Sequence, residues 1–247
     1  MTAIGQPDRA PESSGPFTLV VDIGGTGTKC IIADASGAAV TERTRLLTPK
    51  PATADALLDV IGELVALQTR VFDRVSVGFP GVVRHGVAFN APNLGSDHWR
   101  GVDIAGRIEA LTGKPTRVLN DAELQGYGVI EGRGVELVLT LGTGMGVGLY
   151  TDGHLVPNLE LGHHPFEKGQ TYEDRVSDAE RKRIGNGKWR RRVARALAQI
   201  DPIFNPDVVW VGGGNAKKLR AEELPSNVRT FVNVDGMTGG VRLWGLS

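Results

Sequence analysis

The stretch Asp22-Ile23-Gly24-Gly25-Thr26-Gly27-Thr28-Lys29 follows the apolar run Leu19-Val20-Val21, so a buried strand leads directly into a glycine-rich turn. Gly24 and Gly25 allow the backbone to approach an anion closely. The hydroxyls of Thr26 and Thr28 can donate hydrogen bonds to phosphoryl oxygens. The Asp22 carboxylate can hold a hydrated Mg²⁺ beside them. The stretch therefore predicts a phosphate-binding turn, in which we include Lys29.

Two further glycine turns follow strand-like runs. The first, Gly142-Thr143-Gly144, comes after residues 135–141, and the second, Gly212-Gly213-Gly214, comes after 208–211 and is expected to open a helix. A single turn of this kind also occurs in hairpins that bind no ligand. The turns that begin at Gly24 and Gly142 have neither the P-loop spacing nor the dinucleotide-binding spacing. Together they predict a phosphoryl donor held between two half-sites. The third turn could seat a nucleotide base and ribose.

The amino-acid composition excludes several classes of partner and binding site. The 28 Lys and Arg residues equal the 28 Asp and Glu residues, so no overall field attracts nucleic acid or a membrane surface. The single cysteine, Cys30, rules out an intrachain disulfide and a multi-cysteine zinc site, and it fits a reducing compartment. Residues 1–16 are polar and lack the apolar core of a signal peptide. We therefore expect a disordered tail followed by a soluble, cytoplasmic protein.

Periodicity predicts an α/β protein with two halves. In the first half we expect strands at 18–23, 29–33, 38–47 and 75–79, with helices at 55–69 and from 103 to Gly113. In the second half we expect strands at 116–119, 137–141, 147–150 and 208–211, with helices at 122–130 and over most of 172–204. The predicted organisation is a tail (1–16), an N-terminal α/β domain (17–118) and a C-terminal α/β domain (119–247) that face each other across a cleft.

Five motifs in this order resemble the ROK family of sugar kinases, and most closely its polyphosphate/ATP glucokinase branch. They are Asp22-Ile23-Gly24-Gly25-Thr26, Leu119-Asn120-Asp121-Ala122-Glu123, Gly142-Thr143-Gly144-Met145-Gly146, Glu160-Leu161-Gly162-His163 and Gly212-Gly213-Gly214. The resemblance covers nearly everything from residue 18 onward. It implies the actin-like, ribonuclease-H-like ATPase fold. It also implies phosphate or nucleotide binding by Asp22, Gly24, Gly25, Thr26, Thr28, Lys29, Gly142, Thr143, Gly144, Gly213 and Gly214.

By this resemblance Asp121 is the general base that accepts the proton of the sugar 6-hydroxyl, and Asn120 binds neighbouring hydroxyls. A carboxylate at the end of a strand can reach the attacking oxygen, and an amide both donates and accepts hydrogen bonds. Asn120 and Asp121 are also typical of a helix N-terminus, because both residue types cap helices. Both interpretations stay open at this point.

The resemblance implies that Asn93, Glu160, His163 and Glu173 also bind the sugar. Glu173 is equally typical of an ordinary carboxylate in the first turn of a helix. Many ROK proteins have a cysteine-rich zinc loop after the Gly-His pair, whereas residues 165–173 contain no cysteine. We therefore expect no structural zinc.

Eight basic residues lie between Arg181 and Arg195. They are typical of a solvated helix face, and acidic residues just upstream can pair with part of this charge. They would also suit a long polyanion such as polyphosphate, whose binding weakens as salt rises.

Taken together, the sequence predicts a kinase that transfers a phosphoryl group from ATP or polyphosphate to the 6-hydroxyl of glucose or a close hexose, with Mg²⁺. The alternatives are a ROK kinase for mannose, fructose or N-acetylglucosamine, and a non-catalytic sugar-sensing regulator. Such a regulator needs a DNA-reading module, for which the residues before the first strand are too few. We expect a homodimer whose partners are the hexose and the donor, with no nucleic acid and no membrane.

Overall fold

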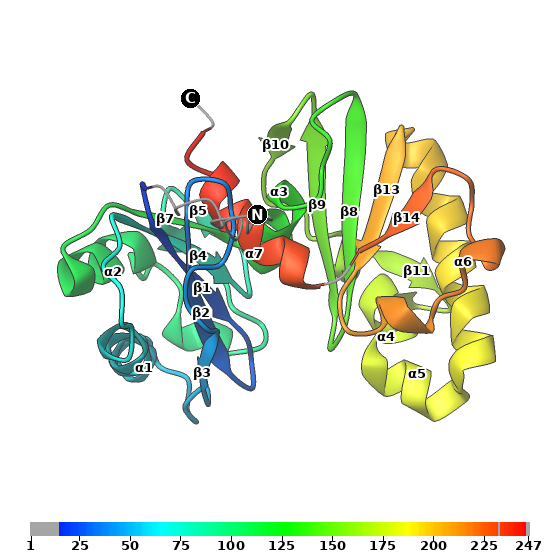
Figure 1. The fold of residues 1–247 in the computed structure, drawn as a ribbon. Coiled ribbons are helices and arrows are strands. Elements are labelled where there is room, and N and C mark those ends of the chain that lie inside the picture. Colours follow the sequence, from blue (N-terminus) through cyan, green and yellow to red (C-terminus); the bar gives the residue numbers. More distant parts are fainter. Residues whose placement is uncertain (1–14, 232, 246–247) are drawn as a thin grey trace, which may run out of the picture.

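The computed structural model describes residues 15–231 and 233–245. Two five-stranded mixed sheets stand side by side with helices between and outside them (Figure 1). The first sheet has the order β3-β2-β1-β4-β7. Its strands are β1 (Thr18–Ile23), β2 (Thr28–Ala33), β3 (Thr44–Leu46), β4 (Arg74–Phe79) and β7 (Thr116–Asn120). Its outer face is covered by α1 (Ala54–Ala66) and α2 (Ile104–Thr112).

The second sheet repeats this plan in the order β10-β9-β8-β13-β14. Its strands are β8 (Val135–Leu141), β9 (Met145–Thr151), β10 (His154–Val156), β13 (Val208–Gly212) and β14 (Val228–Thr230). In each sheet three consecutive strands pair antiparallel and two later strands add in parallel. The outer face is covered by α4 (Tyr172–Val176), α5 (Asp178–Ile184) and α6 (Asn186–Phe204). The same topology in both halves confirms the predicted fold class.

Two helices, α3 (Asp121–Tyr127) and α7 (Asn233–Arg242), lie between the sheets (Figure 1). Val20 of β1, Val138 of β8 and Tyr150 of β9 share one buried cluster with Leu124 and Tyr127 of α3. Because β1 turns Leu19 and Val21 toward α1 and α2 and Val20 toward this middle layer, both faces of the strand are apolar. The middle layer therefore fixes how the two sheets stand relative to each other.

The helices begin and end at residues that the sequence predicts. Thr53 caps α1 by accepting the N–H of Ala56, and α2 ends at Gly113, whose φ of 66° lies in the left-handed region. The segment 172–204 is helical in three pieces, and α6 ends at Phe204, before Asn205 and Pro206. On α6 one apolar face is buried in the outer core of the second sheet; its members are Trp189, Val193, Ala196, Leu197 and Ile200.

Three expectations were wrong. The strand predicted at 38–47 is only β3, since residues 38–43 after the tight turn at 34–38 form one isolated bridge, at Ala39, and no strand. The strand at 116–119 does not begin the second half: β7 pairs in parallel with β4, and the boundary predicted at 118/119 falls inside it. The third glycine turn opens no α-helix but the single 3₁₀ turn η3 (Ala216–Lys218).

The remaining elements are short. They are two hairpins, β5 (Val83–Arg84) with β6 (Val87–Ala88) and β11 (Pro165–Glu167) with β12 (Gln170–Thr171), and the 3₁₀ turns η1 (Ser96–His98), η2 (Leu161–His163) and η4 (Ala221–Glu223). Among the described residues, no helix combines the length and apolar character needed to cross a membrane. The predicted tail, 1–16, lies almost entirely outside the described residues.

Candidate active site

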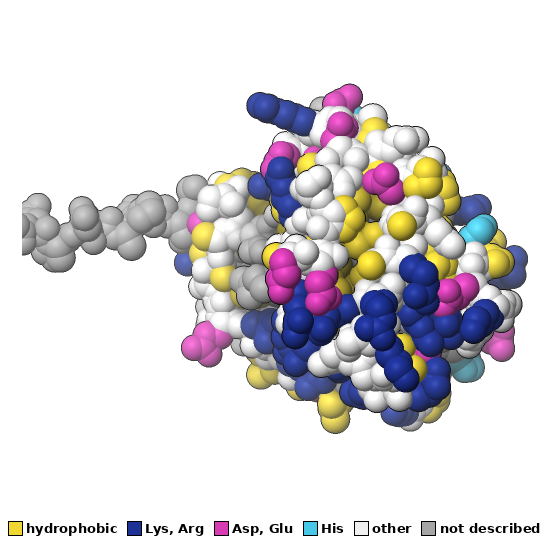
Figure 2. All heavy atoms as spheres, turned by 90° about the vertical axis from the view of Figure 1, so that its right-hand side faces the viewer, with side chains coloured by type: hydrophobic (Ala, Val, Ile, Leu, Met, Phe, Trp, Pro, Cys, Tyr) yellow, Lys and Arg dark blue, Asp and Glu magenta, His cyan; other side chains and the backbone are white. Residues whose placement is uncertain are grey.

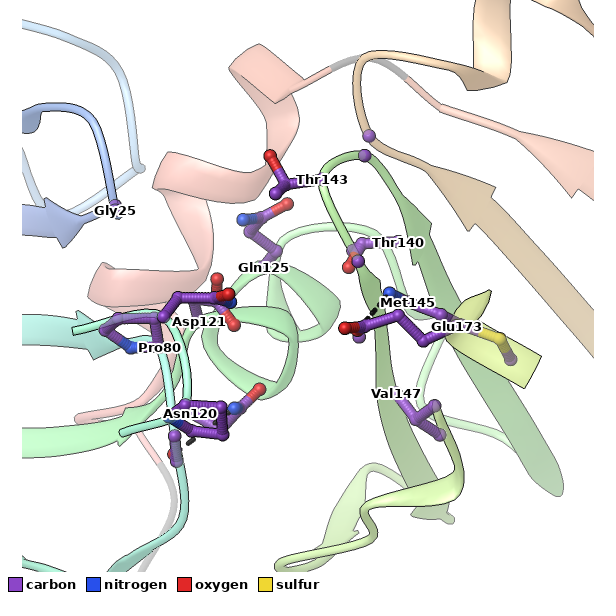
Figure 3. Close-up of a pocket in the computed structure, with 18 of the residues that line it drawn as sticks. Gly25, Pro80, Asn120, Asp121, Gln125, Thr140, Thr143, Met145, Val147 and Glu173 are labelled. Carbon is purple, nitrogen blue, oxygen red and sulfur yellow. Dashed lines mark hydrogen bonds between the residues drawn. The ribbon is translucent and has the colours of Figure 1, made fainter. Parts of the chain in front are cut away.

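A cavity of about 440 Å³ opens between the two sheets. The ends of β1, β4 and β7 supply one wall, the turn between β8 and β9 supplies the other, and the start of α3 lies between them (Figure 3). Strand ends at such a position commonly form binding sites in α/β proteins. Sixteen of the predicted site residues line this cavity. They are Asp22, Gly24, Gly25, Thr26, Lys29, Asn93, Asn120, Asp121, Gly142, Thr143, Gly144, Glu160, His163, Glu173, Gly213 and Gly214.

Thr28 is the exception, because it does not line the cavity, and its prediction as a phosphate-binding residue was wrong. Its side chain is fully buried, and its hydroxyl lies 3.3 Å from the hydroxyl of Thr48. Successive residues of a strand face opposite sides, so when Lys29 faces the cavity Thr28 must face the core under α1. Thr28 is therefore a structural residue that packs the first turn from behind. Thr48 in turn donates a 2.5 Å hydrogen bond to the carbonyl of Gly24.

The three glycine turns meet at the cavity. Gly213 has a φ of 84°, and a Cβ there would lie 2.4 Å from the carbonyl oxygen of Leu141, so glycine is required by the fold itself. A Cβ at Gly142 or Gly214 would instead meet nothing within 4 Å. These two glycines have no such packing reason and border open space, as a turn that receives a ligand would.

Asp22 and Lys29 form an ion pair of 3.2 Å at the first turn. The two residues face each other in the β1–β2 ladder, so the pairing follows from strand register. Both side chains are about 30% exposed and line the cavity. This places one carboxylate and one ammonium group beside the first glycine turn.

Asp121 stands at the first position of α3, facing the cavity (Figure 3). Burial, and secondarily the negative charges of Asp22 and Glu160, raises the pKa of Asp121 to about 7. One carboxylate oxygen accepts the N–H of Ala122 at 2.8 Å. A carboxylate with this pKa is ionised enough to accept a proton near neutral pH and basic enough to hold it.

Asn120 caps α3 and also faces the cavity, so the helix-cap interpretation is confirmed and the sugar-binding role stays a prediction. Its side-chain oxygen caps α3 by accepting the N–H groups of Ala122 and Glu123, and its amide donates to the carbonyl of Gly81 at 3.2 Å. It also lines the cavity. Capping and ligand binding are therefore compatible at this residue.

Glu160 and His163 both line the cavity. His163 Nδ1 is 3.0 Å from a carboxylate oxygen of Glu160. Burial raises the pKa of Glu160, and the contact with His163 opposes that rise. The pair presents hydrogen-bonding groups to the cavity within one 3₁₀ turn, whereas the neighbouring His164 is exposed and contacts the carbonyl of Pro165.

Glu173 is the first-turn carboxylate that the sequence allowed, and it also lines the cavity. It lies in the first turn of α4, and its carboxylate accepts the N–H of Met145 at 3.0 Å, just after the second glycine turn (Figure 3). A Cβ at Gly144 would lie 2.1 Å from the same carboxylate. Glu173 therefore supports the second turn while facing the cavity.

An ionic cluster holds α4 beside the β11–β12 hairpin, in the segment 165–173 that has no cysteine. Arg175, buried, donates to Glu167 and Gln170 of the β11–β12 hairpin and lies 3.8 Å from Glu180 of α5. Hydrogen bonds from Arg183 and then Arg192 hold the pKa of Glu180 at about 2. The hairpin has no thiolate to offer, since Cys30 lies in the first core. Ion pairs therefore hold α4, which carries Glu173, against the β11–β12 hairpin and α5.

The basic stretch 181–195 is largely neutralised. Arg181 and Lys182 pair with Asp178, Arg183 and Arg192 with Glu180, Arg195 with Glu167, and Arg190 with Glu223. For these residues the solvated and paired interpretation fits the structure. Lys188 and Arg191 have no ion pair among the described residues.

Two lining residues with polar side chains, Gln125 and Thr140, were not predicted from the sequence. Gln125 lies one helical turn after Asp121, and this spacing could have found it, because residues four apart share a helix face. Thr140 lies at the end of β8, where strand alternation turns it toward the cavity. No residue-type signal marks either position.

The comparisons with known proteins agree with this geometry. The sequence model described as "ROK family" matches residues 18–180. The chain belongs to the ROK family. It is 35% identical over 208 residues to a polyphosphate glucokinase of Mycobacterium tuberculosis, covering 80% of this chain and 77% of the relative. The polyphosphate glucokinase of Mycobacterium leprae is 34% identical over 250 residues, covering 94% and 76%.

Among solved structures, the inorganic polyphosphate/ATP-glucomannokinase of Arthrobacter sp. strain KM is similar, with a TM-score of 0.82 and 33% identity. The match covers 94% of this chain and 99% of that one. This ROK-family chain therefore has the actin-like ATPase fold that the resemblance implied.

We expect Arg175→Met to lower the free energy of unfolding by about 3 kcal/mol, because it removes a buried cation that pairs with the half-buried Glu167 and the buried Glu180. The KM for sugar should rise as well, since Glu173 lies two residues away. Urea denaturation and steady-state kinetics measure both. Arg183→Met is the matched control: Arg183 also contacts Glu180, at 2.6 Å, but its side chain is 66% exposed, so the loss of stability should be much smaller. Equal losses in the two variants would contradict the cluster's role.

Asp121 also predicts how stability depends on pH. Its folded pKa of about 7 lies above the usual value, so the folded chain holds a proton that the unfolded chain releases from about pH 4 upward. The stabilisation is complete at low pH and is lost as pH rises to about 7. The free energy of unfolding of Asp121→Asn should therefore gain on that of the unsubstituted protein between pH 4 and 7, and stay level above. Urea denaturation at each pH measures this difference. If the difference in the free energy of unfolding between the two proteins stays constant from pH 4 to 7, the pKa of Asp121 is not raised.

Proposed function

We propose that this protein is a polyphosphate/ATP-dependent glucokinase, which transfers the terminal phosphoryl group of polyphosphate or ATP to the 6-hydroxyl of glucose or a close hexose. The observation that carries the proposal is Asp121, a carboxylate with a pKa of about 7 that faces a cavity bordered by three glycine turns. The polyphosphate glucokinases among its relatives support both the sugar and the donor.

The reaction needs little covalent help from the protein. Asp121 accepts the proton of the 6-hydroxyl as that oxygen bonds to the terminal phosphorus of the donor. The bond from this phosphorus to its bridging oxygen breaks, which releases ADP or a polyphosphate shortened by one unit. Positioning the two reactants and neutralising the phosphoryl charge supply most of the acceleration.

Sugar recognition is assigned to the polar side chains around Asp121. Glu160 and Glu173 accept hydrogen bonds from hydroxyls, His163 orients one more, and the amides of Asn93 and Asn120 donate and accept. These groups line one cavity and come from separate elements, which suits a ligand with hydroxyls on several sides.

Donor binding is assigned to the three glycine turns, with Thr26, Thr143 and Lys29 as side-chain partners. Mg²⁺ is held by few protein ligands and keeps waters and phosphate oxygens as the rest. Asp22 fits that requirement, because it is a single part-exposed carboxylate beside the first turn. When bound, the cation would neutralise the charge of the transferring group.

The deciding experiment is a grid of purified protein with glucose, mannose, fructose and N-acetylglucosamine, each tested against ATP and polyphosphate. The proposal expects the highest kcat/KM with glucose or a close hexose such as mannose, with at least one of the two donors. Preference for an N-acetylated sugar would assign another kinase activity, and hexose binding without turnover would indicate a sensor. We further propose a cytoplasmic homodimer, for which analytical ultracentrifugation tests the oligomeric state.

Asp121→Asn should lower kcat by a factor of about 10² or more and leave sugar affinity nearly unchanged, because an amide cannot accept the hydroxyl proton. In the unsubstituted enzyme, kcat/KM should fall about tenfold per pH unit below pH 7 and level off above it. Stopped assays from pH 5 to 9 measure both effects. Near-normal turnover in the variant would remove Asp121 from the role of base.

Gly214→Val should raise the KM for ATP about tenfold, because the added side chain would extend into open space at the third turn, where a base or ribose would lie. The KM for short polyphosphate, which has neither group, should change less than about twofold. Gly187→Val is the control, since a Cβ there also meets nothing within 4 Å but lies on α6. Equal losses with both donors would place the nucleotide elsewhere. Gly213 is unsuitable, because any side chain there collides with Leu141.

Activity should require Mg²⁺ and should return fully when Mg²⁺ alone is added after treatment with a chelator that removes zinc. The reason is that residues 165–173 contain no cysteine to hold zinc. Metal analysis accompanies the assay. Stoichiometric zinc in the active protein, with loss of activity on its removal, would refute this.

A further inference from the structure

The surface on the side of α5 and α6 carries many basic side chains (Figure 2). Between residues 178 and 223 there are eleven Lys and Arg residues against six Asp and Glu residues, although the whole chain is neutral. Most of the arginines are paired, as described above. Four exposed cations have no ion pair among the described residues: Lys188 and Arg191 on α6, and Lys217 and Lys218 on η3. We call these four residues the basic face.

The basic face continues from the cavity. Gly213 and Gly214 line the cavity, and Lys217 and Lys218 follow within four residues. Arg181 ties this loop to the start of α6, because its guanidinium donates to Asn215 at 3.0 Å and to Asn186 at 2.8 Å.

Farther along, Glu223 joins the segment after η3 to α6. One of its oxygens lies 2.7 Å from Arg190, and the other lies 3.4 Å from Arg220. The cations on η3 and α6 therefore border one connected stretch of surface that begins at the third glycine turn.

The paired arginines also shape this surface. Arg181 and Arg190 are held against acidic partners, so their charge is neutralised and their geometry is fixed. The uncompensated charge is left on the four flexible side chains of the basic face. Long cationic side chains in water attract a polyanion without fixed geometry, and the attraction falls steeply with added salt.

We propose that the basic face binds the part of a linear polyphosphate chain that extends beyond the cavity. The inference rests on the proposed function, in which the terminal phosphoryl group reacts beside Asp121. A nucleotide has three phosphates and then a base, which the cavity and its third turn can accommodate. A long polyphosphate must leave the cavity, and past Gly214 it meets Lys217 and Lys218 first, then Lys188 and Arg191.

The length of the polyphosphate chain distinguishes binding at the basic face from binding in the cavity. In the unsubstituted enzyme the KM, expressed per chain, should fall as polyphosphate grows from three units to several tens of units. Lys188→Gln, Arg191→Gln, Lys217→Gln and Lys218→Gln combined should raise the KM for the long chain about tenfold, since each exposed contact contributes modestly. The KM for tripolyphosphate and that for ATP should change less than about twofold, and the salt dependence for the long chain should become shallower.

The control removes two exposed arginines that also have no ion pair among the described residues but lie on other surfaces: Arg43 before β3, and Arg133 before β8. Arg43→Gln with Arg133→Gln should leave the length dependence intact. The two pairs on η3 and α6 are also tested separately, so that a folding defect in one, detected by circular dichroism, leaves the other as a test.

The outcomes are distinct. If polyphosphate of every length supports turnover and the fourfold variant keeps its length dependence, the basic face does not bind the chain. If the variant with all four substitutions shows the same increase in KM for tripolyphosphate as for the long chain, the residues act on the shared phosphate site and the proposal is overturned. A single-stranded oligonucleotide of equal charge that competes as well as polyphosphate would make the face a general polyanion surface, which also overturns it. If no polyphosphate supports turnover while ATP does, the donor assignment fails, and this inference fails with it.

Discussion

The capping box at the start of α3 is the interaction on which the site depends. Asn120 accepts the N–H groups of the first turn, and the Glu123 side chain returns a bond to the N–H of Asn120 at 3.3 Å. Glu123 is only 2% exposed, and its second oxygen accepts the N–H of Asn158 at 2.6 Å, in the loop that leads to Glu160. Its carbonyl accepts the hydroxyl of Tyr150 from the second sheet. The first turn of α3 thus connects β7, β9 and the loop that contains Asn158, and it fixes the position of Asp121 among them.

The distribution of charge explains how a neutral chain handles a polyanionic donor. Four carboxylates, Asp22, Asp121, Glu160 and Glu173, line the cavity, and they suit a polyol. Lys29 is the one Lys or Arg among the described residues that line it. In the proposed reaction, backbone N–H groups, hydroxyls and a divalent cation would have to offset the repulsion between these carboxylates and the donor phosphates. The exposed cations without an ion pair among the described residues of this region lie outside the cavity, on η3 and α6.

Much of this could be predicted from sequence, because short-range signals decide where strands end and helices begin. The glycine turns, the caps at Thr53 and Asn120, and the break after Phe204 all follow from local backbone preferences. Long-range pairing could not be predicted in this way. That β7 joins β4 depends on two strands that are separated in the chain by α2. The partners of Arg175 are near in sequence, but the ionic cluster forms only because the β11–β12 hairpin, α4 and α5 fold against one another. Thr28 was misplaced for a simpler reason: a threonine beside a glycine turn suggested a hydroxyl donor, but the strand begins at that residue and alternation turns it inward.

The residues with two interpretations carry the more general point. Asn120 was open between a helix cap and a sugar ligand, and Glu173 between a first-turn carboxylate and a sugar ligand. In the structure each residue fills its local role, and each also lines the cavity. A side chain that is already held by backbone N–H groups loses little conformational freedom when a ligand binds. The local role therefore supports the ligand role instead of competing with it: a helix N-terminus placed at a cavity both orders its polar residues and directs them toward what enters.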